Sequence, residues 1–117
     1  MTNHGDYADP GPTREEIDAT PGPLVLEFGA NECGYCRAAR PVVEAAFATM
    51  PPVPHVKVAD GPGRPLGRSF KVKLWPTLVF LFDGVEVGRV VRPESEAAVR
   101  TGLQPLVAGE GGDRSGD

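Results

Sequence analysis

The sequence has little of what structural metal sites and disulfide scaffolds need. Its 117 residues include two cysteines, Cys33 and Cys36, and two histidines, His4 and His55. Small secreted folds that depend on disulfides carry several cysteine pairs, so a single pair does not indicate such a scaffold. A zinc site at the two cysteines would still need two more ligands, and only the two histidines remain. The sequence therefore gives little support to either class.

The sequence also lacks an excess of positive charge and any long hydrophobic run. It has 12 Lys and Arg against 16 Asp and Glu, a net charge of -4. Proteins that bind nucleic acid or anionic lipid usually carry the opposite sign. No stretch approaches the roughly 20 apolar residues of a membrane span, and residues 1–12 are polar, without the pattern of a signal peptide. We therefore expect a cytoplasmic protein with no nucleic-acid or membrane partner.

The length and composition are typical of one globular domain. The 13 prolines and 15 glycines cluster at the chain ends and in loops. Residues 1–12 lack apolar periodicity, which predicts a flexible N-terminal arm. We assign residues 13–108 to the domain and residues 109–117 to a flexible C-terminal tail.

Hydrophobic periodicity predicts helices that alternate with strands. We expect helices over residues 13–20, 36–50, 68–72 and 94–107, a loop over 61–67, and strands over 24–28, 55–60, 77–82 and 85–91. The run 24–28 is nearly all apolar, as in a central strand covered on both faces. Asp83-Gly84 is a strong hairpin signal between the last two strands. This order predicts an α/β fold with a mixed sheet and helices on both faces.

Cys33-Gly34-Tyr35-Cys36 lies between a predicted strand and a predicted helix. This spacing brings two sulfurs close enough to form a disulfide across one turn. The amides at the start of the helix point toward Cys33 and favour its thiolate. A thiolate at Cys33 can attack a substrate disulfide, and Cys36 can then resolve the mixed disulfide.

The same spacing also occurs in other kinds of site. Haem attachment needs a histidine after the second cysteine, where this chain has Arg37. A structural disulfide usually closes a long loop, because closing a two-residue gap removes little chain entropy. A zinc site and an inert pair remain open alternatives, but the strand-to-helix context favours redox chemistry.

Several spaced residues make the chain from about residue 24 to 107 resemble the thioredoxin superfamily. The marks are Phe28, Ala30, the pair Cys33 and Cys36, Pro41, the run Trp75-Pro76-Thr77, and Asp83-Gly84. The resemblance implies a thioredoxin-like fold with a central sheet of four, possibly five, strands. The region before residue 24 is short for both a first strand and a first helix, which favours four.

The resemblance also implies which residues bind substrate. Pro76 matches the family's cis-proline, whose loop packs beside the cysteines and offers backbone hydrogen bonds to an extended substrate. Trp75 and Thr77 flank it, and Gly34 and Tyr35 separate the cysteines. A trans proline that opens an edge strand, and a core role for Trp75, remain the alternatives.

Glu27 stands where the family usually has a buried aspartate that moves the proton of the resolving cysteine. Burial among apolar neighbours would raise the pKa of Glu27 and suit it to act as a general base. Lys57 resembles the lysine that pairs with this carboxyl. Both residues could instead face solvent from their strands.

Three departures from the family pattern bear on the redox properties. Glu32 stands where Trp is common and places a negative charge beside the expected thiolate. Tyr35 replaces the usual proline, as in some disulfide isomerases and oxidases, which predicts a less reducing potential within roughly -270 to -120 mV. The glycine that often follows the last strand is absent near Arg92.

We therefore interpret the sequence as a monomeric thiol-disulfide oxidoreductase that needs no organic cofactor or metal. Its expected partners are disulfide-containing proteins and an electron donor, either a reductase or a small thiol such as glutathione. One alternative is an isomerase or oxidase of an oxidising compartment. Another is a binding module that presents Tyr35 and Trp75 to a partner, with incidental redox activity.

Overall fold

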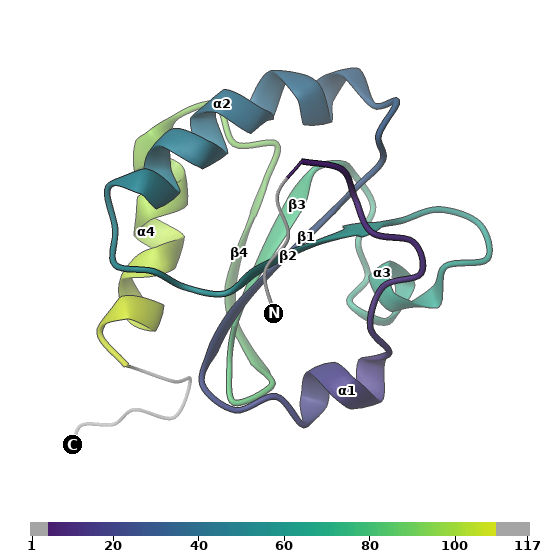
Figure 1. The fold of residues 1–117 in the computed structure, drawn as a ribbon, viewed down its shortest axis with the longest axis horizontal. Coiled ribbons are helices and arrows are strands. Elements are labelled where there is room, and N and C mark those ends of the chain that lie inside the picture. The colour runs from purple at the N-terminus through teal and green to yellow at the C-terminus, as the bar shows by residue number, and fades with distance from the viewer. Residues whose placement is uncertain (1–4, 110–117) are drawn as a thin grey trace.

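The computed structural model describes residues 5–109 and contains a four-stranded sheet with helices on both faces (Figure 1). The elements in chain order are α1 (Arg14–Asp18), β1 (Pro23–Gly29), α2 (Gly34–Ala48), β2 (His55–Ala59), α3 (Pro65–Ser69), β3 (Thr77–Phe82), β4 (Val85–Val91) and α4 (Glu96–Val107). The strand order is β2-β1-β3-β4, and only the β1–β2 pair is parallel among these strands. The predicted α/β fold with a mixed four-stranded sheet is confirmed.

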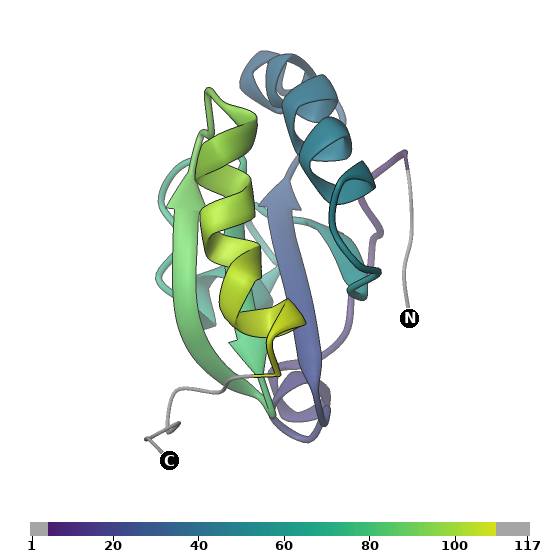
Figure 2. The same cartoon turned by 90° about the vertical axis from the view of Figure 1, so that its left-hand side faces the viewer.

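Each face of the sheet is covered by its own pair of helices. Ile17 of α1 and Leu66 of α3 belong to one hydrophobic core, whereas Val43 of α2 and Leu103 of α4 belong to the other. Figure 2 shows α4 in front of the sheet with α2 beside it. Strand β1 contributes to both cores, because alternate side chains point to opposite faces. This double burial explains the nearly continuous apolar run of its sequence.

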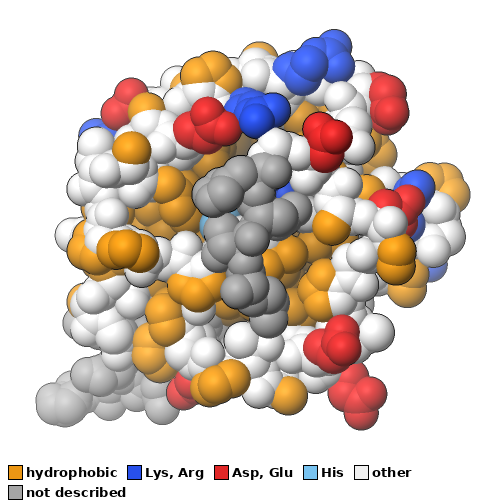
Figure 3. All heavy atoms as spheres, viewed as in Figure 1, with side chains coloured by type: hydrophobic (Ala, Val, Ile, Leu, Met, Phe, Trp, Pro, Cys, Tyr) orange, Lys and Arg blue, Asp and Glu red, His pale blue; other side chains and the backbone are white. Residues whose placement is uncertain are grey.

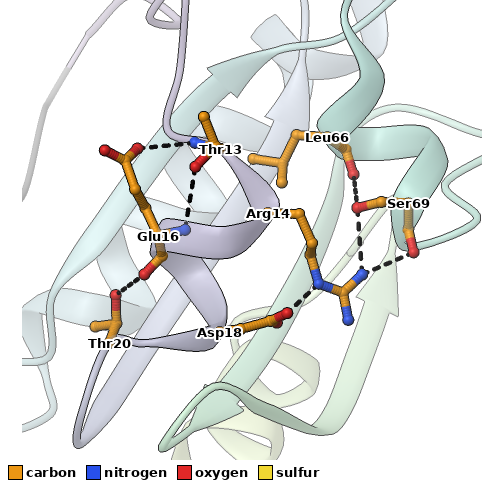
Figure 4. A network of polar contacts seen from close by, with 7 residues as sticks. All are labelled: Thr13, Arg14, Glu16, Asp18, Thr20, Leu66 and Ser69. Carbon is orange, nitrogen blue, oxygen red and sulfur yellow. Dashed lines mark hydrogen bonds and ion pairs between the residues drawn. The ribbon is translucent and has the colours of Figure 1, made fainter.

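A polar network holds α1 against α3 (Figure 4). The Thr13 hydroxyl accepts a hydrogen bond from the Glu16 amide at 3.1 Å, and the Glu16 carboxylate accepts from the Thr13 amide at 2.9 Å. This reciprocal capping confirms the predicted start of the helix. Arg14 then donates to Asp18 at 2.9 Å and to the carbonyl of Ser69 at 2.8 Å. The short first helix is thus fixed at both its start and its outer face.

The third helix begins earlier than predicted. The expected loop over residues 61–67 and helix over 68–72 are wrong in their boundaries, because α3 spans Pro65–Ser69. A proline suits the first turn of a helix, where its missing N–H is not needed. The helix cannot continue far, since Lys71 has a left-handed φ of 60°.

Residues 5–12 pack against the sheet instead of forming the flexible arm expected for residues 1–12. Tyr7 is buried, and the main chain of Ala8 exchanges two hydrogen bonds with β2, at 2.8 and 2.9 Å. This segment lies at the free side of β2, where a fifth strand would pair. The rest of that predicted arm, residues 1–4, and residues 110–117 of the predicted tail lie outside the described residues.

The hairpin between β3 and β4 forms as predicted. Asp83 and Gly84 have φ values of 52° and 79°, the left-handed pair that a two-residue turn of this kind requires. The Asp83 carboxylate also accepts a hydrogen bond from the Gly22 amide at 2.7 Å, which ties the turn to the start of β1. Among residues 5–109, no helix combines the length and the apolar character needed to cross a bilayer.

Candidate active site at the Cys33-Cys36 turn

The two cysteines lie where β1 passes into α2, as the sequence predicts. Cys33 is the N-cap residue of α2, and its sulfur accepts a hydrogen bond from the Cys36 amide at 3.2 Å. A sulfur at this position faces the positive end of the helix dipole. The helix begins at Gly34, two residues earlier than predicted, and Pro41 lies inside it. Pro41 therefore lies in the interior of the helix and not in its first turn.

The two sulfurs have different environments. Both are free thiols, but Cys33 is partly exposed whereas Cys36 is only 3% exposed. Burial, together with a smaller contribution from the Cys33 side chain, raises the pKa of Cys36 to about 11. Cys33 is therefore the sulfur that a substrate can reach. Cys36 holds its proton near neutral pH and needs an acceptor before it can attack.

The loop before β3 has the cis-proline expected from the resemblance. The Trp75–Pro76 peptide bond is cis, and Pro76 and Thr77 are buried. The Thr77 hydroxyl donates to the carbonyl of Leu74 at 2.6 Å and so bonds within the loop itself. Trp75 is half-buried, and its indole Nε1 donates to Asp60 at 2.9 Å. The trans-proline alternative is wrong, and Trp75 is neither fully buried nor fully exposed.

Arg92 joins the cysteine turn to the cis-proline loop. Its guanidinium carbon lies 3.7 Å from the centroid of the Tyr35 ring, and its Nε donates to the carbonyl of Trp75 at 2.8 Å. Arg92 has a left-handed φ of 47°, near the point where the resemblance leads us to expect a glycine after the last strand. Tyr35 is 60% exposed and Leu74 is 46% exposed. Tyr35 and Leu74 thus form an exposed apolar surface, and Arg92 links the two loops that carry it.

Glu27 is buried, and both of its carboxylate oxygens have partners. Oε2 accepts a hydrogen bond from the Tyr7 hydroxyl at 2.5 Å, and Oε1 lies 2.8 Å from Nε2 of His55. Lys57 lies opposite Glu27 in the register of β1 and β2 and is also buried, with its Nζ donating to the carbonyl of Gly5 at 2.6 Å. The alternative that Glu27 and Lys57 face solvent is therefore wrong.

The pKa of Glu27 lies below its ordinary value, so the predicted rise is wrong. Burial does raise this pKa, as the apolar strand led us to expect. The hydrogen bond and charge of His55, the Tyr7 hydrogen bond and the charge of Lys57 together outweigh burial. The sequence showed the apolar neighbours within the strand but not the polar partners on other elements. Glu27 is therefore an ionised carboxylate in a buried cluster.

Tyr7, His55 and Gly29 complete the site and were not anticipated. A Cβ added at Gly29 would lie 2.6 Å from Cζ of Tyr7 and 2.7 Å from Sγ of Cys36. Only glycine leaves room there for the phenol and the sulfur. One signal for His55 was available, because His55 and Lys57 alternate on the strand that pairs with Glu27. No local pattern marks Tyr7.

A cavity of about 770 Å³ opens between α2 and the start of β2. Glu27, His55 and Lys57 line it together with apolar side chains such as Phe47 and Val53, and neither cysteine does. Figure 3 shows hydrophobic side chains gathered on this side of the molecule below α2. The cavity therefore reaches the buried polar cluster without including either cysteine. Among residues 5–109, no three His, Cys, Asp or Glu side chains gather where they could hold a metal ion.

Known proteins resemble this chain in both sequence and structure. A family model described as Thioredoxin matches residues 12–104. Thioredoxin from Mycobacterium bovis is 33% identical over 88 residues, which cover 73% of this chain and 74% of that protein. The structure of thioredoxin 2 from Pseudomonas aeruginosa PAO1 in its reduced form is 51% identical with a TM-score of 0.80, covering 89% of this chain and 96% of that one.

The match to Thioredoxin H-type 1 from Nicotiana tabacum covers a smaller share of both chains. It is 35% identical over 78 residues, which are 67% of this chain. The chain spans 62% of the length of that relative.

Proposed function

The chain belongs to the thioredoxin family, and on this premise we propose that it reduces or exchanges disulfides in protein substrates through Cys33 and Cys36. The main support for this proposal is that the two sulfurs at the start of α2 differ in exposure and in protonation. Cys33 is accessible and caps the helix, whereas Cys36 is buried and keeps its proton. That difference assigns Cys33 the role of nucleophile and Cys36 the role of resolving cysteine.

The reaction proceeds in two exchanges. The Cys33 thiolate attacks one sulfur of the substrate disulfide, the S–S bond breaks, and the other substrate sulfur leaves as a thiolate that takes up a proton. Cys36 then loses its proton and attacks Sγ of Cys33. The mixed disulfide breaks, the second substrate sulfur leaves, and the Cys33–Cys36 disulfide forms. The substrate gains two electrons and the cysteine pair loses them.

Substrate binds at the surface formed by the cysteine turn and the cis-proline loop. Gly34 leaves open space beside Cys33, since a Cβ there would meet only the tip of Arg37 at 4.0 Å. Tyr35 and Trp75 offer aromatic contacts, and Pro76 and Thr77 hold the loop that receives an extended segment. Glu27 and Lys57 act on the proton of Cys36 rather than on the substrate. These roles are supported by the exposure of Tyr35 and the burial of Glu27 and Lys57.

A reducing compartment such as the cytoplasm is the setting that this activity requires. The oxidised pair has to be reduced again before the next turnover, and the donor is a reductase or a small thiol. All residues of the proposed site come from one chain, so a monomer is sufficient for activity.

The test uses two single variants and a protein substrate with a known disulfide. Cys36→Ser is expected to accumulate a covalent complex with the substrate through Cys33, visible as a shift on a non-reducing gel. Cys33→Ser is expected to form no such complex, and both variants should lose steady-state reduction of the substrate. A covalent complex through Cys36 in Cys33→Ser would reverse the assignment. Full activity in either variant would refute the proposed function.

A further inference from the structure

We propose that Tyr7 is a proton-relay residue for the resolving step: its hydroxyl accepts the proton that Cys36 loses and passes its own proton to the Glu27 carboxylate. This inference rests on the proposed function, because the relay matters only if Cys36 has to become a nucleophile. It adds to the site a residue from the N-terminal segment, which precedes α1 and is far from both cysteines in the sequence.

The first observation is the convergence of two side chains above Gly29. The distances from a Cβ built at Gly29 to the Tyr7 ring and to the Cys36 sulfur are 2.6 and 2.7 Å, so the two side chains meet over the same backbone atom. At this proximity the Cys36 thiol helps to raise the pKa of Tyr7, and the Tyr7 hydroxyl lowers the pKa of Cys36 against the larger opposing effect of burial. The missing side chain of Gly29 is what permits this approach.

The second observation is the other contact of the same hydroxyl. The Tyr7 oxygen lies 2.5 Å from Oε2 of Glu27, a short hydrogen bond in which the phenol donates and the carboxylate accepts. The hydroxyl therefore bonds the proton acceptor directly, while the ring that carries it approaches the sulfur of the proton donor above Gly29. Burial and the neighbouring carboxylate raise the pKa of Tyr7 far above its ordinary value. Tyr7 therefore stays protonated. When its oxygen takes up the Cys36 proton, it has to release its own proton to Glu27.

The third observation is how firmly Tyr7 is held. Its amide donates to Oδ1 of Asn31, in the loop before Cys33, at 2.8 Å. The next residue, Ala8, is hydrogen-bonded to β2 on both sides of its peptide. The Lys57 ammonium lies 4.6 Å from the centroid of the Tyr7 ring. A fixed hydroxyl between two fixed partners is the arrangement that proton transfer needs.

The relay balances in protons and charge. The Cys36 proton moves to the Tyr7 oxygen as the original phenol proton moves to Oε2 of Glu27. Tyr7 ends as it began, Cys36 becomes a thiolate, and Glu27 becomes a neutral acid. The Cys36 thiolate then breaks the mixed disulfide as described above. Glu27 keeps its other oxygen against His55 and lines the cavity, through which its proton can return to solvent.

The experiment follows the two exchanges separately with dithiobis-nitrobenzoate, whose thiol product is coloured. Excess reduced protein releases a first equivalent of colour when Cys33 attacks and a second when Cys36 resolves. In Tyr7→Phe the ring remains but the hydroxyl is lost. We expect the first phase to stay within about twofold of wild type and the second to slow by about a hundredfold, the lower end of the range for an acid–base contribution. An unchanged second phase in a folded variant would overturn the relay.

Two further variants separate a relay from a loosened segment. Asp9→Asn removes the exposed ion pair of Asp9 with Arg64 at 2.7 Å and so weakens the same segment without touching Tyr7. The relay predicts a normal second phase in Asp9→Asn, and equal slowing in Asp9→Asn and Tyr7→Phe would refute it. In a Glu27→Gln background, Tyr7→Phe should add less than twofold, because both changes interrupt one path. Independent, multiplying effects would refute a shared path.

These outcomes are distinguishable from a failure of the proposed function. If wild-type protein releases only one equivalent of colour, or if Cys33→Ser retains the first phase, the assignment of the two cysteines fails. If wild type shows both phases and Tyr7→Phe leaves them unchanged, only the relay fails. Thermal unfolding of each variant shows whether it is folded before its rates are compared.

Discussion

Tyr7 interacts with both Cys36 and Glu27, so one phenol affects the pKa of the buried thiol and the pKa of the buried carboxyl. The buried thiol is hard to deprotonate, and the buried carboxylate is held in its ionised form by His55, Tyr7 and Lys57. A carboxylate of low pKa is a weak base, but Glu27 can accept the Cys36 proton through a single hydroxyl, that of Tyr7. Glu27 therefore contributes to the resolving step through its position and not through its basicity.

The lowered pKa of Glu27 predicts a specific dependence of stability on pH. A carboxyl whose pKa is lower in the folded than in the unfolded state stabilises the fold above its ordinary pKa of 4.5, and this stabilisation is lost as pH falls through the lower folded value. As the pH falls from neutral to below the folded-state pKa of Glu27, the unfolding free energy of wild type should therefore decrease more than that of Glu27→Gln. Urea unfolding of both proteins at several pH values checks this. A steeper acid loss in Glu27→Gln would contradict it.

Arg92 predicts an effect on substrate binding with little effect on folding. Arg92→Gly removes the backbone strain of a left-handed non-glycine residue, about 1 kcal/mol, and loses a cation–π contact of similar size. Stability should change by less than about 1 kcal/mol in either direction. The KM for a protein disulfide should rise several-fold with kcat nearly unchanged, since Tyr35 and the Trp75 carbonyl lose their brace.

Steady-state kinetics of Arg92→Gly and Arg92→Lys, with chemical unfolding, measure these effects. The lysine variant keeps the charge without the planar guanidinium and should resemble the glycine variant in KM. A wild-type KM in both variants would show that Arg92 does not organise the substrate surface.

At the scale of elements, local sequence patterns predicted the features that depend on interactions between residues close in the chain. The apolar run of β1, the start of α1 and the Asp83-Gly84 turn all depend on residues close in sequence, and all three formed as expected. The start of α3 differs from the prediction because Gly and Pro are typical of loops, although proline is also favoured in the first turn of a helix. Packing of Leu66 and Phe70 into the core then selects the helix.

The end of β1 offers a test of the packing that brings Tyr7 and Cys36 together. Gly29→Ala would place a Cβ inside the contact distance of both side chains, so we expect a loss of about 1–3 kcal/mol in unfolding free energy. The second exchange should also slow, because the phenol and the sulfur are forced apart. Gly88→Ala in β4 is the matched control, since a Cβ there meets nothing within 4 Å. Equal stability of the two variants would contradict the account.

At the scale of the whole molecule, the site joins segments that only the fold brings together. The cysteine motif and the cis-proline were predictable, because their spacing is itself the signal. Tyr7 was not, because residues 5–12 have no periodicity, and their burial depends on the free side of β2 and on the space above Gly29. His55 and Arg92 likewise act through contacts between elements distant in the chain. The residue types in the motifs predicted the thiol-disulfide chemistry. The residues that transfer protons and organise the substrate surface depend on tertiary contacts, which the sequence does not show.

The most direct test of the central claim is the reduction potential of the Cys33–Cys36 pair in defined glutathione buffers, read by thiol trapping. The account predicts a reversible two-electron equilibrium, within roughly -270 to -120 mV. A value near the reducing end supports a reductase, and one near the oxidising end supports an isomerase or oxidase with the same two cysteines. If no intramolecular disulfide forms under oxidising buffer, Cys33 and Cys36 are not a redox pair and the account is wrong.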